Sequence, residues 1–162
     1  MPLARSRHLF VLAFMLAMLA LSAAVHIEKV VALRPCPLRF VQHGLLFLIA
    51  IGNAVAWWHR PGLRVNRLYC ISLLLLTASG AASAIRQLWL QSNPLPLHVC
   101  PSANLLLLGK SEALLETVKM LVLGTPDCAI INWTLLDMSL PEWSLLTFAG
   151  LAVIIAAQLF QR

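Results

Sequence analysis

Four long apolar segments constrain the fold of this chain more than any other feature. They cover about residues 9–25, 40–58, 68–90 and 145–160. A helix rises ~1.5 Å per residue, so roughly 20 apolar residues, or about 17 at the least, cross a ~30 Å hydrocarbon core. The composition agrees, because 60% of the 162 residues are hydrophobic and only 11% are charged. The sequence therefore predicts an all-α membrane protein, a bundle of four transmembrane helices in one domain of residues 1–162.

The first apolar segment also has features of a signal peptide. Arg5 and Arg7 precede it, and the small residues 22–24 follow it. Its apolar run is longer than the ~7–15 residues of a typical signal-peptide core, and three more apolar segments follow. We therefore expect it to be kept as a membrane span.

The arginines predict the orientation in the bilayer. They precede the first segment, crowd the link between the second and third, and end the chain, at Arg5, Arg7, Arg60, Arg64, Arg67 and Arg162. Such residues mark the cytoplasmic side, so both termini are expected there, with loops of about residues 26–39 and 91–144 outside. The net charge is +6. The basic residues lie beside apolar runs and form no basic stripe, so we expect no nucleic acid partner.

Three of the four cysteines fall in the predicted outer loops. Cys36 opens the second span in "RPCPLRFVQHG", and Cys100 and Cys128 fall in the long loop. Paired cysteines persist as disulfides in an oxidising outer compartment, but three is an odd number. Cys70 lies near the cytoplasmic end of the third span, where we expect a small buried packing residue.

The long loop contains a predicted amphipathic helix. The stretch "SEALLETVKMLVLG", residues 111–124, places leucine and valine on one face and charged residues on the other, and it ends at Gly124. Such a helix lies on the membrane surface or packs against the loop's own residues, and the sequence leaves both interpretations open. The chain has no glycine-rich phosphate loop and no cysteine and histidine spacing that suits zinc, so we expect no metal site.

Together these features resemble the DsbB family of disulfide bond formation proteins. The resemblance rests on "CPL-x-x-x-Q" opening the second span, "RQLWLQ" closing the third, two cysteines in the long loop, and "DCAIINWTLLDMSLPEWSLLTF" leading into the fourth. It implies a bacterial inner-membrane oxidoreductase that oxidises a periplasmic DsbA-type protein and passes electrons to ubiquinone or menaquinone. It also implies a redox-active Cys100–Cys128 disulfide that meets the partner, with Cys36 as the first cysteine of a C-x-x-C motif.

The chain departs from the family pattern at the quinone end. Arg39 replaces the second cysteine of the motif, His43 stands where the family usually has an arginine, and Gln87 stands where many members have histidine. The resemblance implies a quinone site of Gln42, His43, Arg86 and Gln87, with snorkelling to the interface as the alternative for Arg86. These departures bear on the hand-over of electrons to quinone.

Arg39 changes what Cys36 can do. A guanidinium cannot form a disulfide or carry electrons. It can favour the thiolate of Cys36, as can the dipole of the helix that follows. Such a thiolate would form an inter-loop disulfide with Cys100 or Cys128.

Several alternatives stay open at this point. Cys36 is either a redox residue or an inert one between Pro35 and Pro37, and Cys100 and Cys128 form either a redox pair or a structural disulfide. The protein is correspondingly either a quinone-coupled thiol oxidoreductase or a quinone-uncoupled or non-catalytic paralogue that only binds a thioredoxin-fold partner.

Overall fold

The computed structural model describes residues 2–31, 36–59, 62–93, 115, 118–119, 121–124, 126–129, 134–135 and 137–160. Its main elements are four long helices: α1 (Pro2–Val31), α2 (Pro37–His59), α3 (Leu63–Ser92) and α5 (Leu140–Phe160). Each contains one of the predicted spans, and each is long and apolar enough to cross a membrane. The predicted four-helix membrane fold is confirmed.

The helices are longer than the predicted spans, which corrects the loop boundaries. α1 continues to Val31 and α2 begins at Pro37, so most of the expected loop of residues 26–39 is helical. Proline suits the first turn of a helix because its missing N–H has no partner there in any case. Arg39 therefore lies in the first turn of α2 and not in a loop. The expected loop of residues 91–144 is likewise shortened, because α5 begins at Leu140.

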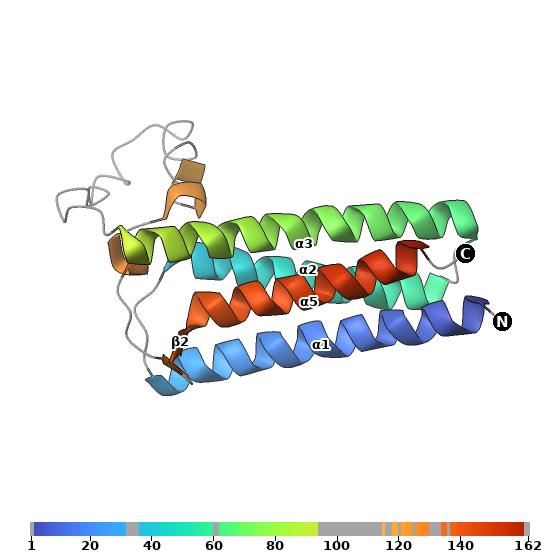
Figure 1. The fold of residues 1–162 in the computed structure, drawn as a ribbon, viewed down its shortest axis with the longest axis horizontal. Helices are drawn as coiled ribbons and strands as arrows, with labels where there is room; N and C mark the ends of the chain where they lie inside the picture. Colours follow the sequence, from blue (N-terminus) through green and yellow to red (C-terminus); the bar gives the residue numbers. More distant parts are fainter. Residues whose placement is uncertain are drawn as a thin grey trace.

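The four helices lie side by side in an up-down-up-down bundle (Figure 1). α1 packs against α2 and α5, and α3 packs against the same two helices. The start of α1 and the end of α5 lie at one end of the bundle, which we call the terminal end (Figure 1). The short helix η2 (Pro126–Ala129) and strand β2 (Met138–Ser139) lie at the opposite end. We call that opposite end the disulfide end.

Two apolar clusters hold the bundle together. The larger one takes residues from all four helices and includes Phe10, Ile49, Leu73 and Phe148. A Cβ at Gly80 of α3 would overlap the Phe148 ring, so glycine lets α3 and α5 approach closely, as small residues do in membrane bundles. The smaller cluster lies at the disulfide end and consists of Cys36, Leu38, Leu90 and Cys128.

The start of α5 is fixed by local hydrogen bonds. Strand β1 (Thr134–Leu135) pairs antiparallel with β2, and Asp137 between them has a φ of 59°, a conformation that aspartate tolerates. Ser139 then precedes the helix, and its backbone N–H and its hydroxyl (2.9 Å) both donate to Glu142 Oε2. This arrangement is half of a capping box, so the end of the long loop is tied to the bundle.

Candidate functional site

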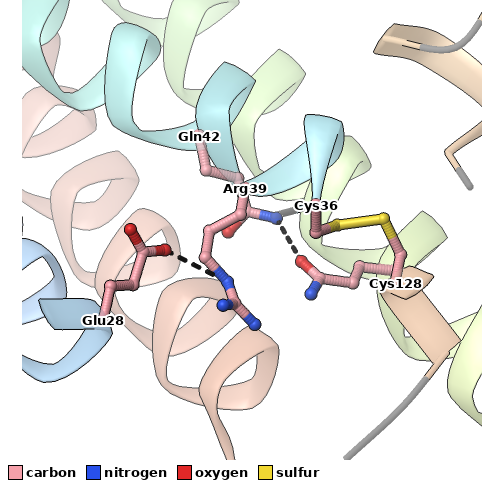
Figure 2. Close-up of a disulfide and its surroundings, with 6 residues drawn as sticks. Glu28, Cys36, Arg39, Gln42 and Cys128 are labelled. Carbon is pink, nitrogen blue, oxygen red and sulfur yellow. Dashed lines mark hydrogen bonds and ion pairs between the residues drawn. A yellow bond between two sulfur atoms is a disulfide. The ribbon is translucent and has the colours of Figure 1, made fainter. Parts of the chain in front are cut away.

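A disulfide joins the start of α2 to the long loop. The sulfurs of Cys36 and Cys128 are bonded at 2.06 Å, their Cα atoms lie 5.1 Å apart, and 92 positions separate them in the chain. Cys36 comes immediately before α2, and Cys128 belongs to η2, which packs against α3 (Figure 2). The bond therefore holds this part of the loop against the ends of two helices.

The observed pairing differs from the Cys100–Cys128 disulfide that the family resemblance implies. In this structure Cys128 is bonded to Cys36, and a sulfur takes part in one disulfide at a time. Leu38 and Leu90 pack with the two cysteines in one apolar cluster. The structure therefore forms one of the inter-loop pairings that the sequence leaves open. Cys100 lies outside the described residues.

The disulfide is shielded from solvent. Cys36 is 7% exposed and Cys128 is 2% exposed, so a thiolate in solution cannot reach either sulfur without some opening of the loop. Gly124 helps to hold the loop down. Its φ of 81° requires a residue without a side chain, and a Cβ there would stand 2.8 Å from side-chain carbons of both Leu38 and Leu90.

The predicted amphipathic helix before Gly124 is described in part. Leu115, Val118, Lys119 and residues 121–123 have helical backbone, and the conformation of Gly124 agrees with the predicted end of the helix. The apolar side chains of Leu115, Val118 and Val122 are each more than half exposed. Exposed apolar side chains favour the membrane-surface position over packing within the loop.

Arg39 is paired with an acidic residue of α1. Its Nε lies 3.3 Å from Glu28 Oε1, and the Nε2 of His43 lies 3.7 Å from the same oxygen. Arg39 and His43 are spaced by four residues along α2, so they share a helix face, and that face meets α1 here. The Arg39 side chain is 15% exposed, so solvent screens this ion pair less than it screens a surface pair.

Gln42 and Gln87 form a buried pair at the same end of the bundle. The Nε2 of Gln42 donates to Oε1 of Gln87 at 3.0 Å, which links α2 to α3. Both side chains are almost fully buried, at 2% and 1% exposure. A buried amide without a partner is costly, so this bond fixes the two helices in register. Two of the four residues expected at the quinone site are thus brought into direct contact.

Arg86 lies apart from that pair. Its guanidinium stacks over the ring of Trp89, 4.6 Å from the centroid, and Trp89 is exposed on the outer face of α3. Arg86 and Gln87 differ by about 100° around the helix, since a turn takes 3.6 residues. This stacking agrees with the interfacial alternative for Arg86. Cys70 is buried as expected, with its sulfur 3.9 Å from Gln158 Oε1.

Glu28 is a residue of the site that was not predicted from the sequence. A signal was available, because Glu28 is the first acidic residue of the chain and the next is Glu112. A lone carboxylate close to an arginine and a histidine will attract both. The pairing depends on α1 and α2 lying side by side, because 11 positions separate Glu28 from Arg39 in the chain.

Comparisons with known proteins agree with this architecture. Residues 6–158 match the family model described as "Disulfide bond formation protein DsbB". The chain is 42% identical over 164 residues to disulfide bond formation protein B of Stutzerimonas stutzeri, covering 100% of this chain and 99% of that protein. It is 40% identical over 152 residues to disulfide bond formation protein B 1 of Pseudomonas aeruginosa, covering 93% and 92%. No solved structure gives a significant match.

The family match and the four apolar helices identify a multi-pass protein of the bacterial inner membrane. The match covers all four helices and includes Cys36, Cys128 and the segment between α3 and α5. The chain therefore belongs to the DsbB family of membrane disulfide bond formation proteins.

Proposed function

We propose that this protein oxidises a periplasmic DsbA-type protein through its outer cysteines and passes the electrons to a membrane quinone. The observation that carries the proposal is the Cys36–Cys128 disulfide, which joins the start of α2 to the long loop. In this proposal both termini are cytoplasmic and the disulfide end faces the periplasm. Exposed Arg64 and Arg67 near the terminal end support that orientation.

The outer cysteines exchange one disulfide among three sulfurs. Two of the three possible pairings take part in this proposal: Cys36–Cys128 with Cys100 as a thiol, and Cys100–Cys128 with Cys36 as a thiol. Attack of the Cys100 thiolate on Cys128 converts the first into the second, because the new S–S bond forms as the old one breaks and its electron pair leaves on Cys36. Cys128 is common to both arrangements, so it is the central sulfur of the exchange.

The partner reduces this system in two balanced steps. A thiolate of the reduced partner attacks the Cys100–Cys128 disulfide, forms a mixed disulfide and releases one loop thiolate. The partner's second thiol then attacks its own mixed disulfide, so that the partner leaves with a disulfide. Two electrons and two protons have then moved from the partner to thiols of this protein.

The residues at the disulfide end suit the binding of a quinone, although they do not include the second cysteine of the family motif. His43 and Arg39 are partly buried N–H donors, and such donors suit a quinone carbonyl. We therefore assign His43, with Arg39 and the nearby Gln42–Gln87 pair, to hold the quinone, and we give Arg86 no direct contact. When bound, a quinone supplies a two-electron, two-proton acceptor. Cys36 and Cys128 are the thiols that deliver those electrons and protons.

Arg39 also favours a second candidate, a paralogue that is uncoupled from quinone. The ion pair with Glu28 occupies the position where the family has its second cysteine. Such a protein would bind the partner and exchange one disulfide with it, but it would not regenerate that disulfide. The two candidates differ in the number of turnovers, which can be measured.

The test uses the purified full-length protein, an excess of reduced DsbA-type partner and a quinone. The proposal predicts repeated turnover, with one quinone consumed for each partner disulfide formed. A Cys36→Ser variant is expected to oxidise about one equivalent of partner through Cys100–Cys128 and then stop, because the sulfur that delivers electrons to quinone is gone.

A matched control for this test is Cys70→Ala, which removes a buried thiol at the far end of α3 and should leave turnover unchanged. If the natural sequence itself stops after one equivalent, the uncoupled paralogue is correct. If no partner is oxidised at all, both candidates fail.

A further inference from the structure

Glu28 of α1 contacts two basic side chains near the start of α2. Every charged side chain described on α2 and α3 is basic, and Glu28 on α1 contacts two of these basic groups through a single carboxylate oxygen. All three side chains lie in the part of the bundle that holds the disulfide. Glu28 is therefore a carboxylate in direct contact with the start of α2.

The geometry shows what the contact does to Arg39. In Figure 2 the Arg39 side chain extends toward Glu28, while the Cys36–Cys128 disulfide lies on the other side of the helix start. Cys36 itself is held in the first turn, because its carbonyl oxygen accepts the backbone N–H of Arg39 at 3.1 Å and that of Phe40 at 3.3 Å. The backbones of Arg39 and Cys36 are thus held in one helical turn, and only the Arg39 side chain can change its partner.

We propose that Glu28 is a positioning residue that acts through Arg39: it draws the guanidinium to the α1 side and neutralises it, and so limits the stabilisation of the Cys36 thiolate. This inference rests on the proposed redox role of Cys36. In this proposal Glu28 sets how readily Cys36 leaves the disulfide.

The chemical consequence follows from the exchange step. When a thiolate attacks Cys128, the electron pair of the broken S–S bond leaves on Cys36, which then carries a full negative charge. The N-terminus of α2 favours that charge, and a free Arg39 guanidinium would favour it further. A carboxylate that occupies the guanidinium reduces the second contribution. Cys36 is then a poorer leaving group, and the Cys36–Cys128 state persists.

Other titratable groups of the described residues contribute less at this position. His43 contacts the same carboxylate oxygen of Glu28, so when protonated it shares the neutralisation with Arg39. Lys29 and His26 belong to α1 but are exposed, so solvent screens their charges. Lys29 is therefore a suitable control, because it is adjacent to Glu28 in sequence but is exposed.

The test measures the charge at Cys36 without partner or quinone. In the full-length protein with Cys70→Ala, Cys100→Ser and Cys128→Ser, Cys36 is the only thiol, and its alkylation by iodoacetamide is followed against pH. Adding Glu28→Gln should shift the midpoint of alkylation down by about one pH unit, the low end of the effect of a nearby opposite charge. Arg39→Gln should shift it upward, because the remaining stabilisation of the Cys36 thiolate by the guanidinium is then lost.

Two further variants separate positioning from general damage. Glu28→Asp keeps the charge and should restore most of the original midpoint, and Lys29→Gln should leave it unchanged. The proposal is overturned if Glu28→Gln leaves the midpoint where it was. It is also overturned if Glu28→Gln causes the same shift when Arg39 is already glutamine, since Glu28 would then act on Cys36 directly. Because the assay contains no partner, it can succeed where partner oxidation fails, and the reverse.

Discussion

A Cys128→Ser variant is expected to lose catalysed oxidation of the partner by a factor of at least about 10³, as when a member of a catalytic unit is removed. Cys128 is bonded to Cys36 in the structure, and the proposed exchange also requires it for the Cys100–Cys128 state. Its loss therefore removes both arrangements, whereas Cys36→Ser leaves one. The rate is measured with reduced partner in excess, and non-reducing gels report any mixed disulfide.

The comparison between Cys36→Ser and Cys128→Ser has a built-in control for folding. Both substitutions remove the same covalent bond, so both release the loop from α2 to the same extent, and their thermal stabilities should be similar. A difference in activity between them therefore reports chemistry. Comparable single-turnover activity in the two variants would contradict the central position given to Cys128.

The double substitution Arg39→Cys with His43→Arg is expected to raise the quinone-linked rate at least about tenfold, equivalent to ~1.4 kcal/mol in the activation free energy. Arg39→Cys supplies a second thiol in the first turn of α2, three residues after Cys36. His43→Arg supplies a permanent cation close to Glu28, because His43 already lies 3.7 Å from Oε1 of that residue. The carboxylate thus keeps a partner after Arg39 is lost. The measurement is the rate of quinone reduction with excess reduced partner.

The matched control for this experiment is Arg39→Ser with His43→Arg. It makes the same change in charge and nearly the same change in size, but it adds no thiol. The account predicts no gain from it. An equal gain in both double variants would show that the benefit comes from relieving the Arg39 charge and not from a second cysteine.

Much of the fold could be predicted from the sequence because membrane spans have a strong local signal. Apolar runs of the right length identified all four helices. The positions of the helix ends were predicted less well. The sequence around Pro37 and Glu28 has neither a long apolar run that marks a span nor a pattern that marks a loop. Their helical state depends on packing between α1 and α2 beyond the apolar runs, which the sequence pattern does not express.

The site was predicted less completely than the fold. The sequence identified Cys36 and Cys128 individually but did not choose between Cys100 and Cys128 as the partner of Cys36. In the structure Cys128 is that partner, and the bonded pair packs with Leu38 and Leu90. The Gln42–Gln87 bond and the role of Glu28 likewise depend on which helix faces meet. Such contacts join distant positions and have no local pattern.

The central claim is that Cys36 and Cys128 form a reversible disulfide between the start of α2 and the long loop. The most direct measurement is acid-quenched thiol trapping followed by peptide mapping, before and after addition of reduced partner. The account predicts a Cys36–Cys128 peptide with Cys100 alkylated in the resting protein, and loss of that peptide after addition of the partner. A resting protein in which Cys36 is always alkylated, or a Cys36–Cys128 bond that survives excess partner, would contradict it.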